Sequence, residues 1–491
     1  MAHTNPSAAI ALNRFGLGAR PDEPVPQDPR RWLLDQFGRY QPRPVAWAAL
    51  PTSDTLLTGF LQQQRDNRQQ QDADDKKAAQ QSMRRELRSD YLSAVQARAQ
   101  SALDTPAPFV ERLVHFWANH FALSVDKVAI VGLAGGFEAE AIRPHVLGRF
   151  EDMLLAAERH PAMLLYLDQA RSIGPGSMAA TRAAQRNPQQ QRGLNENLAR
   201  EIMELHTLGV RSGYSQEDVT EFARALTGWS IGGTGPGARF LAGAGMQARN
   251  AAGGFGRGPA GMAPPAPPGF EPGGFAFYPV LHEPGPRTVM GRRYDPAGEG
   301  QARAILHDLA AAPATARHIA TKLARHFVAD DPPPALVDRL AEAFSRSGGD
   351  LPTVYRVLVE APEAWATATP KFKTPWDWTL SSLRGLGARD VQGLQIAPLL
   401  NQLGQPVWRP GSPAGFDDIA ASWAAPDALV RRVEVAQRFA ARAAATRDAR
   451  ALGASLLPGS FSDATATAVA RAESPATGIA LLLVSPDFLR R

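Results

Sequence analysis

Apolar residues recur at helical spacing through most of this chain, and that periodicity restricts the fold more than any other feature. After Phe109, apolar side chains return at Leu113, Phe116 and Trp117, which is the i, i+4, i+7, i+8 stripe of an amphipathic helix. Comparable stripes predict further helices over 195–208, 215–226, 313–328, 335–347, 351–360, 375–386, 426–445, 463–471 and 475–484. The sequence therefore predicts a mostly α protein.

Strand signals are few. Apolar and aromatic residues at 275–277 and 288–290 flank the turn-rich segment 282–286, which indicates a short hairpin or two extended arms. Strands and helices do not alternate along the chain, so we do not expect a doubly wound sheet. We expect one large helical domain over residues 1–491 with a small β-hairpin.

Three segments interrupt the helical pattern. Residues 62–82 are almost wholly polar and fit either a solvated helix or a disordered run. Residues 172–192 are rich in Gly, Ser, Gln and Asn, and we expect a flexible loop there. Residues 231–274 are rich in Gly and Pro, which predicts a mobile, disordered insertion.

Composition excludes several classes of function. With 44% hydrophobic and 21% charged residues, the chain is able to bury a substantial core. The net charge of +5, from 53 basic and 48 acidic residues, is too small for the basic surface of a nucleic-acid-binding protein. The absence of cysteine excludes thiolate nucleophiles, disulfides and Cys-ligated metals.

No segment has the character of an export signal or a membrane span. The first residues, MAHTNPSAAIALNRF, lack a basic start and a sustained apolar run. The most apolar stretch, GIALLLVSPDFL, is interrupted by Pro486. From the sequence as written we expect a soluble, cytoplasmic protein.

Familiar catalytic motifs do not account for this chain. Gly228-Trp229-Ser230-Ile231-Gly232 matches the G-x-S-x-G nucleophile elbow, but a helix rather than a strand is predicted before Ser230. Neither the phosphate-binding loop G-x-x-x-x-G-K-[ST] nor the zinc motif H-E-x-x-H is present. A candidate site has to be sought among polar residues on amphipathic helices.

The predicted helix from Phe109 places His120 on the apolar stripe, next to Asn119. The simpler interpretation is a core histidine with both ring nitrogens hydrogen-bonded, because buried polar groups generally find partners. The alternative is a proton carrier or ligand with a shifted pKa.

The helix over 195–208 carries the densest set of ionisable groups. Arg200 and Glu204 continue an i, i+4 series that fits a row of surface ion pairs. If buried instead, Glu201 and Glu204 would share a proton or a cation. His206 lies on the apolar side of the same helix.

The helix over 313–328 aligns His318, Lys322, Arg325 and His326 along one side. A solvated basic face is the default interpretation. The alternative is a cationic surface that receives an anion or the acidic helix.

Because shifted pKa values concentrate at functional sites, we hypothesise an acid–base or cation-dependent, hydrolase-like enzyme with its site between these three helices. The acid–base or cation-binding residues would be His120, Glu201, Glu204, His206 and Asn119, and the residues that orient an anionic substrate would be Arg200, Arg325 and His326. Metal and substrate identity stay open. The competing hypothesis is a binding or assembly module without chemistry, because Arg and Trp side chains are frequent anchors at protein interfaces.

Several long stretches resemble a known family. They read ALNRFGLGARP, ERLVHFWANHFALS, NENLAREIMELHTLGV, FAFYPVLHEPGPRTVMG and ATARHIATKLARHFVADDPPP, and they resemble the bacterial domain of unknown function 1800 (DUF1800). The resemblance implies a mostly helical unit without an assigned activity, often encoded beside a secreted sulfatase-like protein. It also implies a periplasmic or secreted location, because members commonly carry an export signal. The family often has histidine where Ala118 stands here.

Overall fold

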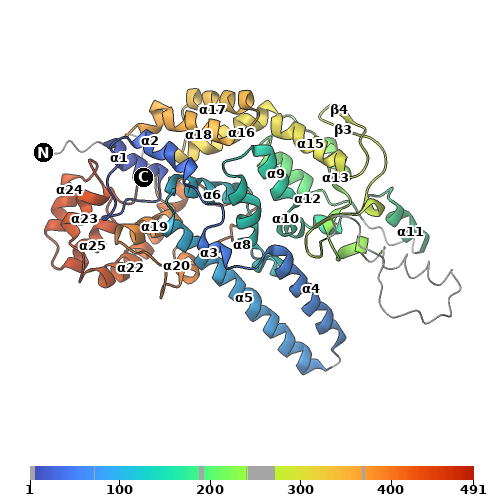
Figure 1. The fold of residues 1–491 in the computed structure, drawn as a ribbon, viewed down its shortest axis with the longest axis horizontal. Helices are drawn as coiled ribbons and strands as arrows, with labels where there is room; N and C mark the ends of the chain where they lie inside the picture. The colour runs from blue at the N-terminus through green and yellow to red at the C-terminus, as the bar shows by residue number, and fades with distance from the viewer. Residues whose placement is uncertain (1–5, 71, 187–192, 239, 241–270, 368–370) are drawn as a thin grey trace.

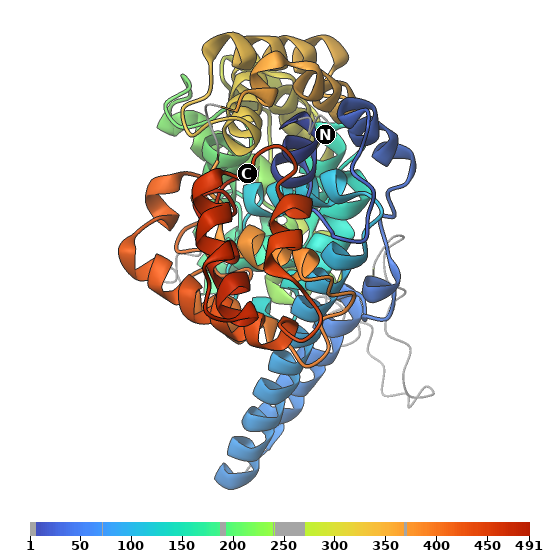
Figure 2. The same cartoon turned by 90° about the vertical axis from the view of Figure 1, so that its left-hand side faces the viewer.

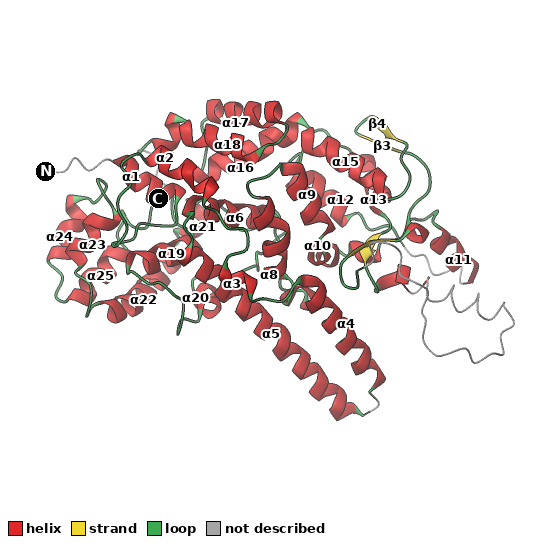
Figure 3. Ribbon diagram, viewed as in Figure 1, coloured by secondary structure: helices red, strands yellow, loops and turns green. Residues whose placement is uncertain are grey.

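The computed structural model describes residues 6–70, 72–186, 193–238, 240, 271–367 and 371–491. Helices dominate this part of the chain, and two small antiparallel sheets complete it (Figure 3). The mostly α fold predicted from the periodicity is confirmed. In the described residues, every helix is too short or too polar to traverse a lipid bilayer.

The N-terminal half consists of short helices around two long ones. The α-helices are α1 (Pro6–Ile10), α2 (Pro29–Leu34), α3 (Val45–Ala48), α4 (Ser53–Gln69), α5 (Ala73–Asp104), α6 (Pro108–His120), α7 (Val128–Val131), α8 (Ala134–Phe137), α9 (Phe150–Arg159), α10 (Pro161–Tyr166), α11 (Met178–Arg186), α12 (Asn197–Glu201) and α13 (Gln216–Leu226). Three π-helical turns accompany them: η1 (Ala11–Phe15), η3 (Glu138–Ile142) and η6 (Ile202–His206).

The C-terminal half is also mostly helical. The α-helices are α15 (Glu299–Ala311), α16 (Pro313–Phe327), α17 (Pro334–Ser347), α18 (Leu351–Glu360), α19 (Pro375–Gly385), α20 (Ile396–Gln402), α21 (Ala420–Trp423), α22 (Pro426–Ala443), α23 (Ala449–Leu456), α24 (Asp463–Ala470) and α25 (Pro475–Leu483). Short 3₁₀ turns occur in both halves: η2 (Asp35–Gly38), η4 (Arg143–His145), η5 (Gln169–Arg171), η7 (Pro279–Leu281) and η8 (Pro362–Trp365).

Local sequence signals explain where many helices begin and end. Ser215 and Asp218 form a reciprocal capping box at the start of α13. Thr374 caps α19, and a proline stands in its first turn, where the missing N–H costs nothing. Gly348 ends α17 in the left-handed conformation.

The strands pair differently from the hairpin that their positions suggested. Strand β2 (Phe275–Phe277) pairs with β1 (Trp229–Ile231), whereas β3 (Arg287–Val289) pairs with β4 (Arg292–Tyr294). The two segments that flank 282–286 are therefore separate arms, and the small hairpin is β3–β4. Although β2 and β3 are close in sequence, β2 forms its backbone hydrogen bonds with β1.

Helices α4 and α5 form an antiparallel arm that projects from the body (Figures 1 and 2). Most of the polar segment 62–82 lies in this arm, and its described residues are helical except Gln70 and Asp72 between the two helices. The described residues of 58–93 include no buried side chain, whereas α5 enters the core from Ala94 onward.

The other two interrupting segments are described in part. Met178–Arg186, where we expected a loop, forms α11, and 187–192 lies outside the described residues. Most of the Gly/Pro-rich segment, 239 and 241–270, also lies outside them.

One large hydrophobic core joins both halves of the chain, with members from Ile10 to Leu489. Helix α6 runs through it and is buried at every position except Asn119. Polar side chains on α6 are therefore forced to find partners inside the protein or at a cavity.

Candidate active site

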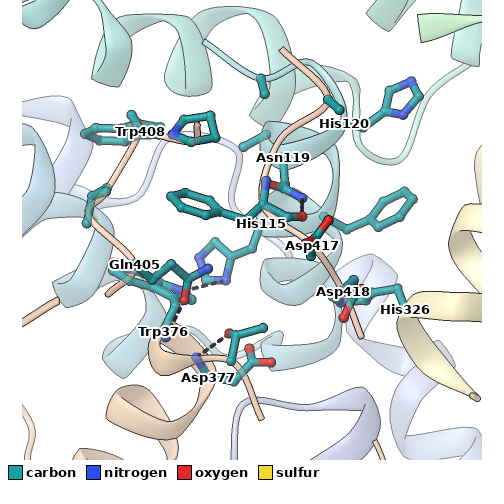
Figure 4. Close-up of a pocket in the computed structure, with 18 of the residues that line it drawn as sticks. His115, Asn119, His120, His326, Trp376, Asp377, Gln405, Trp408, Asp417 and Asp418 are labelled. Carbon is teal, nitrogen blue, oxygen red and sulfur yellow. Dashed lines mark hydrogen bonds and ion pairs between the residues drawn. The ribbon is translucent and has the colours of Figure 1, made fainter. Parts of the chain in front are cut away.

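A charged cavity lies beside α6. Its lining comes from α5, α6, α16, the start of α19 and the loop 405–418, and its volume is about 210 Å³ (Figure 4). The ionisable and aromatic lining residues include Arg98, Arg112, His115, His120, Lys322, Arg325, His326, Trp376, Asp377, Trp408, Asp417 and Asp418. Since pockets for drug-sized ligands start at about 300 Å³, this one suits a smaller molecule.

His326 and Asp418 form a histidine–carboxylate pair on one side of the cavity. The His326 Nδ1 and Asp418 Oδ2 atoms are hydrogen-bonded, and Nε2 of His326 is buried without a partner. Burial lowers the pKa of His326, so its imidazole is neutral at pH 7. Because a carboxylate only accepts, Nδ1 carries the proton and Nε2 retains a lone pair.

Several cations hold Asp418 ionised. Arg491 Nη2 lies 3.4 Å from its Oδ1, and Lys371 Nζ donates to its backbone carbonyl at 2.5 Å. Burial alone would raise the pKa of Asp418, but the hydrogen bond from His326 and the positive charges of Arg491 and Lys371 hold it below its ordinary value. The pair is therefore a neutral imidazole beside a carboxylate.

A second buried carboxylate, Asp377, lies in the same charge network. Arg112 Nη1 donates to its Oδ1 at 2.9 Å, and Arg491 Nε lies 3.4 Å from its Oδ2. Burial opposes ionisation, but Arg112 and Arg491 outweigh it and lower the pKa of Asp377 to about 2. Arg491 thus connects Asp377 with Asp418.

Trp376 and Trp408 lie on the opposite side of the cavity (Figure 4), and Arg98 also belongs to the lining. The Arg98 guanidinium carbon lies 4.4 Å from the ring centroid of Trp376 and 5.5 Å from that of Trp408. Its charge is balanced by Glu138 Oε2 at 2.8 Å, a carboxylate buried in the π-helical turn η3. Trp408 itself has a φ of 48°, a strained backbone conformation of the kind that clusters at functional sites.

Asn119 attaches the loop 405–418 to α6. Its Nδ2 donates to the Phe416 carbonyl at 2.9 Å, and its Oδ1 accepts from the Phe416 N–H at 2.8 Å (Figure 4). Both ends of the amide are used, so Asn119 positions the loop that carries Asp418. Gly415, at φ 86°, lies directly against it.

We expect Gly415→Ala to destabilise the protein more than a glycine replacement in open space. A Cβ at Gly415 would lie 2.3 Å from the Asn119 carbonyl oxygen, in addition to the strain at positive φ. Gly404, at φ 88° with no atom within 4 Å, is the matched control. Strain alone costs about 1–2 kcal/mol, and we expect Gly415→Ala to cost about 1–3 kcal/mol more in urea unfolding. Equal losses for the two variants would contradict the close contact.

His120 and His318 cap the end of the π-helical turn η6. His120 Nε2 donates to the His206 carbonyl at 3.1 Å, and His318 Nε2 donates to the Leu205 carbonyl at 3.1 Å. The last carbonyls of a helix lack hydrogen-bond donors within the helix, and the two imidazoles act as those donors. Burial lowers the pKa of His120 far below normal and that of His318 to about 4.

His120 retains a free acceptor. Because Nε2 carries the proton, Nδ1 carries a lone pair that can accept a hydrogen bond. The Nδ1 atom is buried and has no hydrogen-bond partner, and the residue belongs to the cavity lining. His206, in contrast, lies outside the cavity lining, where its Nδ1 is 2.7 Å from Oε1 of the fully buried Glu158. The interpretation of His120 as a core histidine with both ring nitrogens hydrogen-bonded therefore holds for Nε2 but not for Nδ1.

The charged residues of the predicted helix 195–208 do not line the cavity. Arg200 lies 3.2 Å from Glu196 and 3.6 Å from Glu204, with the Arg200 side chain 36% exposed and that of Glu204 28% exposed. Burial raises the pKa of Glu201. None of Arg200, Glu201 and Glu204 belongs to the cavity lining, whereas Asn119, His120, Arg325 and His326 do.

His115 is a further lining residue that the sequence interpretation left aside. Its Nδ1 accepts a hydrogen bond from Trp376 Nε1 at 3.1 Å, so its proton lies on Nε2 (Figure 4). Burial lowers the pKa of His115 well below normal. The sequence reasoning omitted Asp377 and Asp418, and it considered Trp376 and Trp408 only as interface anchors of the binding-module hypothesis. The only signal for them was their place in the segments PWDW and WRPGSPAGFDD, where acids adjoin tryptophan, proline and glycine.

The nucleophile-elbow interpretation of Ser230 stays rejected. Ser230 lies in β1, buried, and donates to the Ala170 carbonyl at 3.2 Å, which is incompatible with an exposed nucleophile elbow. No group of three or more His, Asp or Glu side chains in the described part of the chain has the arrangement of a metal site.

Comparison with known proteins gives a family but no activity. Neither the curated proteins nor the solved structures contain a match to this chain. The family model described as "Protein of unknown function (DUF1800)" matches residues 10–490. The match covers nearly the whole chain, including every element that lines the cavity, and the chain therefore belongs to the DUF1800 family.

Proposed function

We propose that the cavity is the active site of an enzyme that works by general acid–base catalysis, of the hydrolase type. His326 would carry the proton, and Asp418 would orient its imidazole. The observation that supports this most directly is the hydrogen bond between His326 and Asp418 at the edge of a cavity that both residues line. Hydrogen-bonded histidine–carboxylate pairs of this kind serve as proton acceptors in unrelated enzymes.

The charges around the pair suit that role. A neutral imidazole is the form that accepts a proton, and burial favours it in His326. Once His326 is protonated, the ionised Asp418 stabilises the cation without itself taking the proton. Arg112 and Arg491, held against Asp377, keep the surrounding charge fixed during this cycle.

The other candidate residues receive different roles in this proposal. Asn119 is a positioning residue, because both ends of its amide bind the Phe416 backbone. His120 would supply an acceptor through Nδ1, a buried ring nitrogen without a hydrogen-bond partner. We assign no proton transfer to Arg200, Glu201 and Glu204, which lie outside the lining.

The test is turnover of small chromogenic substrates, namely p-nitrophenyl esters, phosphates, sulfates and glycosides. For a substrate that the native protein converts, we expect His326→Gln to lower kcat by at least about 100-fold, the contribution of a general base. Asp418→Asn should lower it as well and alter the pH profile. His307→Gln, which changes an exposed histidine paired with Glu151, is the control that should retain full activity. Equal rates for native protein and His326→Gln would contradict the proposal.

A second candidate function is an assembly module that acts with a separately encoded partner, such as the sulfatase-like protein implied by the family resemblance. The α4–α5 arm favours it, because a projecting two-helix arm without buried residues over 58–93 offers a large free surface. Co-expression with the sulfatase-like protein tests this function. A stoichiometric complex that is lost on charge reversal of Arg84 and Arg85 in the arm would support it, whereas separate elution would contradict it.

A further inference from the structure

Lys322 is a cation of the cavity without a counter-charge in contact. It is partly buried on α16 and lines the cavity, but its ammonium makes no hydrogen bond or ion pair with any described residue. The other buried cations of the cavity are paired, since Arg98 contacts Glu138 and Arg112 contacts Asp377. A charge kept in a poorly hydrated site without a partner destabilises the fold unless a ligand supplies the partner.

The neighbours of Lys322 add little negative charge to balance its ammonium group. His120 of α6 and His318 of α16 face it, and the charge of Lys322 adds to burial in lowering the pKa of both imidazoles. Arg325, one turn further along α16, has its Nε on the Asp330 carbonyl and no carboxylate partner. Among the described residues, the neighbouring acid that favours the charged lysine is Asp418, and its own oxygens already contact His326 and Arg491.

We propose that Lys322, together with Arg325, binds an oxyanion group of the ligand that the cavity accepts: a carboxylate, sulfate or phosphate. This inference rests on the proposed function, for which it names the class of substrate. An ammonium offers three donors to such a group, and charge-assisted hydrogen bonds to oxyanions are about twice as strong as neutral ones. The bound anion would lie on the same helix face as His326, one turn from the proton carrier, so it would orient the rest of a small ligand toward that imidazole.

The state of Lys322 makes the inference sensitive to pH. Burial lowers the pKa of Lys322 to about 8, and Asp418 opposes that shift while Arg325 adds to it. An anion binds the protonated amine and raises this pKa, so binding near pH 8 should take up a proton. Affinity should be highest below pH 8 and fall above it as the free amine loses its proton.

The experiment is calorimetric titration of the whole protein with inorganic phosphate, sulfate and acetate, which distinguish the three oxyanion chemistries. We expect at least one of them to bind with a Kd in the range of about 1 mM, and Lys322→Met to weaken it at least about tenfold. Arg317→Met removes one positive charge from the exposed side of the same helix, where Arg317 pairs with Asp338, and should change the affinity less than about twofold. Repeating the titration in buffers of different ionisation enthalpy reports the proton uptake.

Stability measurements keep the test decisive. Removing the unpaired, partly buried charge should raise the Tm in Lys322→Met, and Lys322→Gln is a second variant that keeps a polar head without the charge. Unchanged anion affinity in both variants would overturn the inference, and so would absence of binding by all three anions. Loss of turnover in His326→Gln would still support the proposed acid–base function in that event, so the two failures are distinguishable.

Discussion

Arg143→Met should lower the free energy of unfolding by about 3–5 kcal/mol, because it leaves a buried carboxylate without its counter-ion. Arg143 Nη1 and Nη2 each donate to Glu111, to Oε1 and Oε2 respectively, at 2.8 Å, and both side chains are 1% exposed. Arg143 Nε also donates to the Pro42 carbonyl, and the guanidinium lies 5.5 Å from the ring centroid of Trp47. Urea unfolding followed by circular dichroism measures the loss.

Two comparisons separate the buried charge from lost packing. Glu111→Gln combined with Arg143→Met removes both charges, and we expect the double variant to lose less than the sum of the two single variants. Arg346→Met breaks the exposed pair Arg346–Glu342, whose side chains are 72% and 60% exposed, and should cost less than about 1 kcal/mol. Similar losses for Arg143→Met and Arg346→Met would contradict the dominant role of burial.

Most of the fold follows from signals that act over a few residues. The predicted helix 351–360 coincides with α18, because Asp350 caps it and the apolar stripe continues to Val359. Helix α17 ends at Ser347 because Gly348 adopts the left-handed conformation there. Periodicity, caps and glycine positions are all local, so the sequence alone is enough to place these boundaries within a few residues.

The candidate site depends on contacts between distant parts of the chain. Asp418 lies 92 residues after His326, and Asp377 lies 265 residues after Arg112. No spacing pattern connects such partners, so the two carboxylates were not predicted. His326 was predicted as a substrate-binding residue, because its place on a basic helix face was visible but its acidic partner was not.

The helix over 195–208 shows how local geometry alters a predicted face. Residues 202–206 form a π-helical turn rather than α-helix, and its wider turn rotates the residues that follow. His206 therefore points to Glu158, while its carbonyl accepts from His120. The sequence hypothesis grouped Glu201, Glu204 and His206 with His120, but in the structure His120 donates to the His206 carbonyl, and Glu201 and Glu204 lie outside the cavity lining.

The free energy of unfolding should fall steadily as the pH is lowered from 7 to 5. Burial holds the pKa of His115, His120 and His318 below normal, and that of His318 is about 4. An unfolded histidine titrates near pH 6.5, so between that pH and the folded pKa the unfolded chain binds more protons. Stability is therefore complete above pH 6.5 and is lost on acidification, by up to about 1.4 kcal/mol per pH unit for each such histidine.

His318→Gln isolates one of these contributions. The glutamine side-chain amide is able to keep the donor to the Leu205 carbonyl, which His318 Nε2 supplies at 3.1 Å, but it does not titrate. Urea unfolding at several pH values should give this variant a smaller slope than the native protein, by up to about 1.4 kcal/mol per pH unit. Identical slopes would mean that His318 takes up its proton as readily in the folded protein as in the unfolded chain, and the cap on the π-helical turn would then not hold the imidazole neutral.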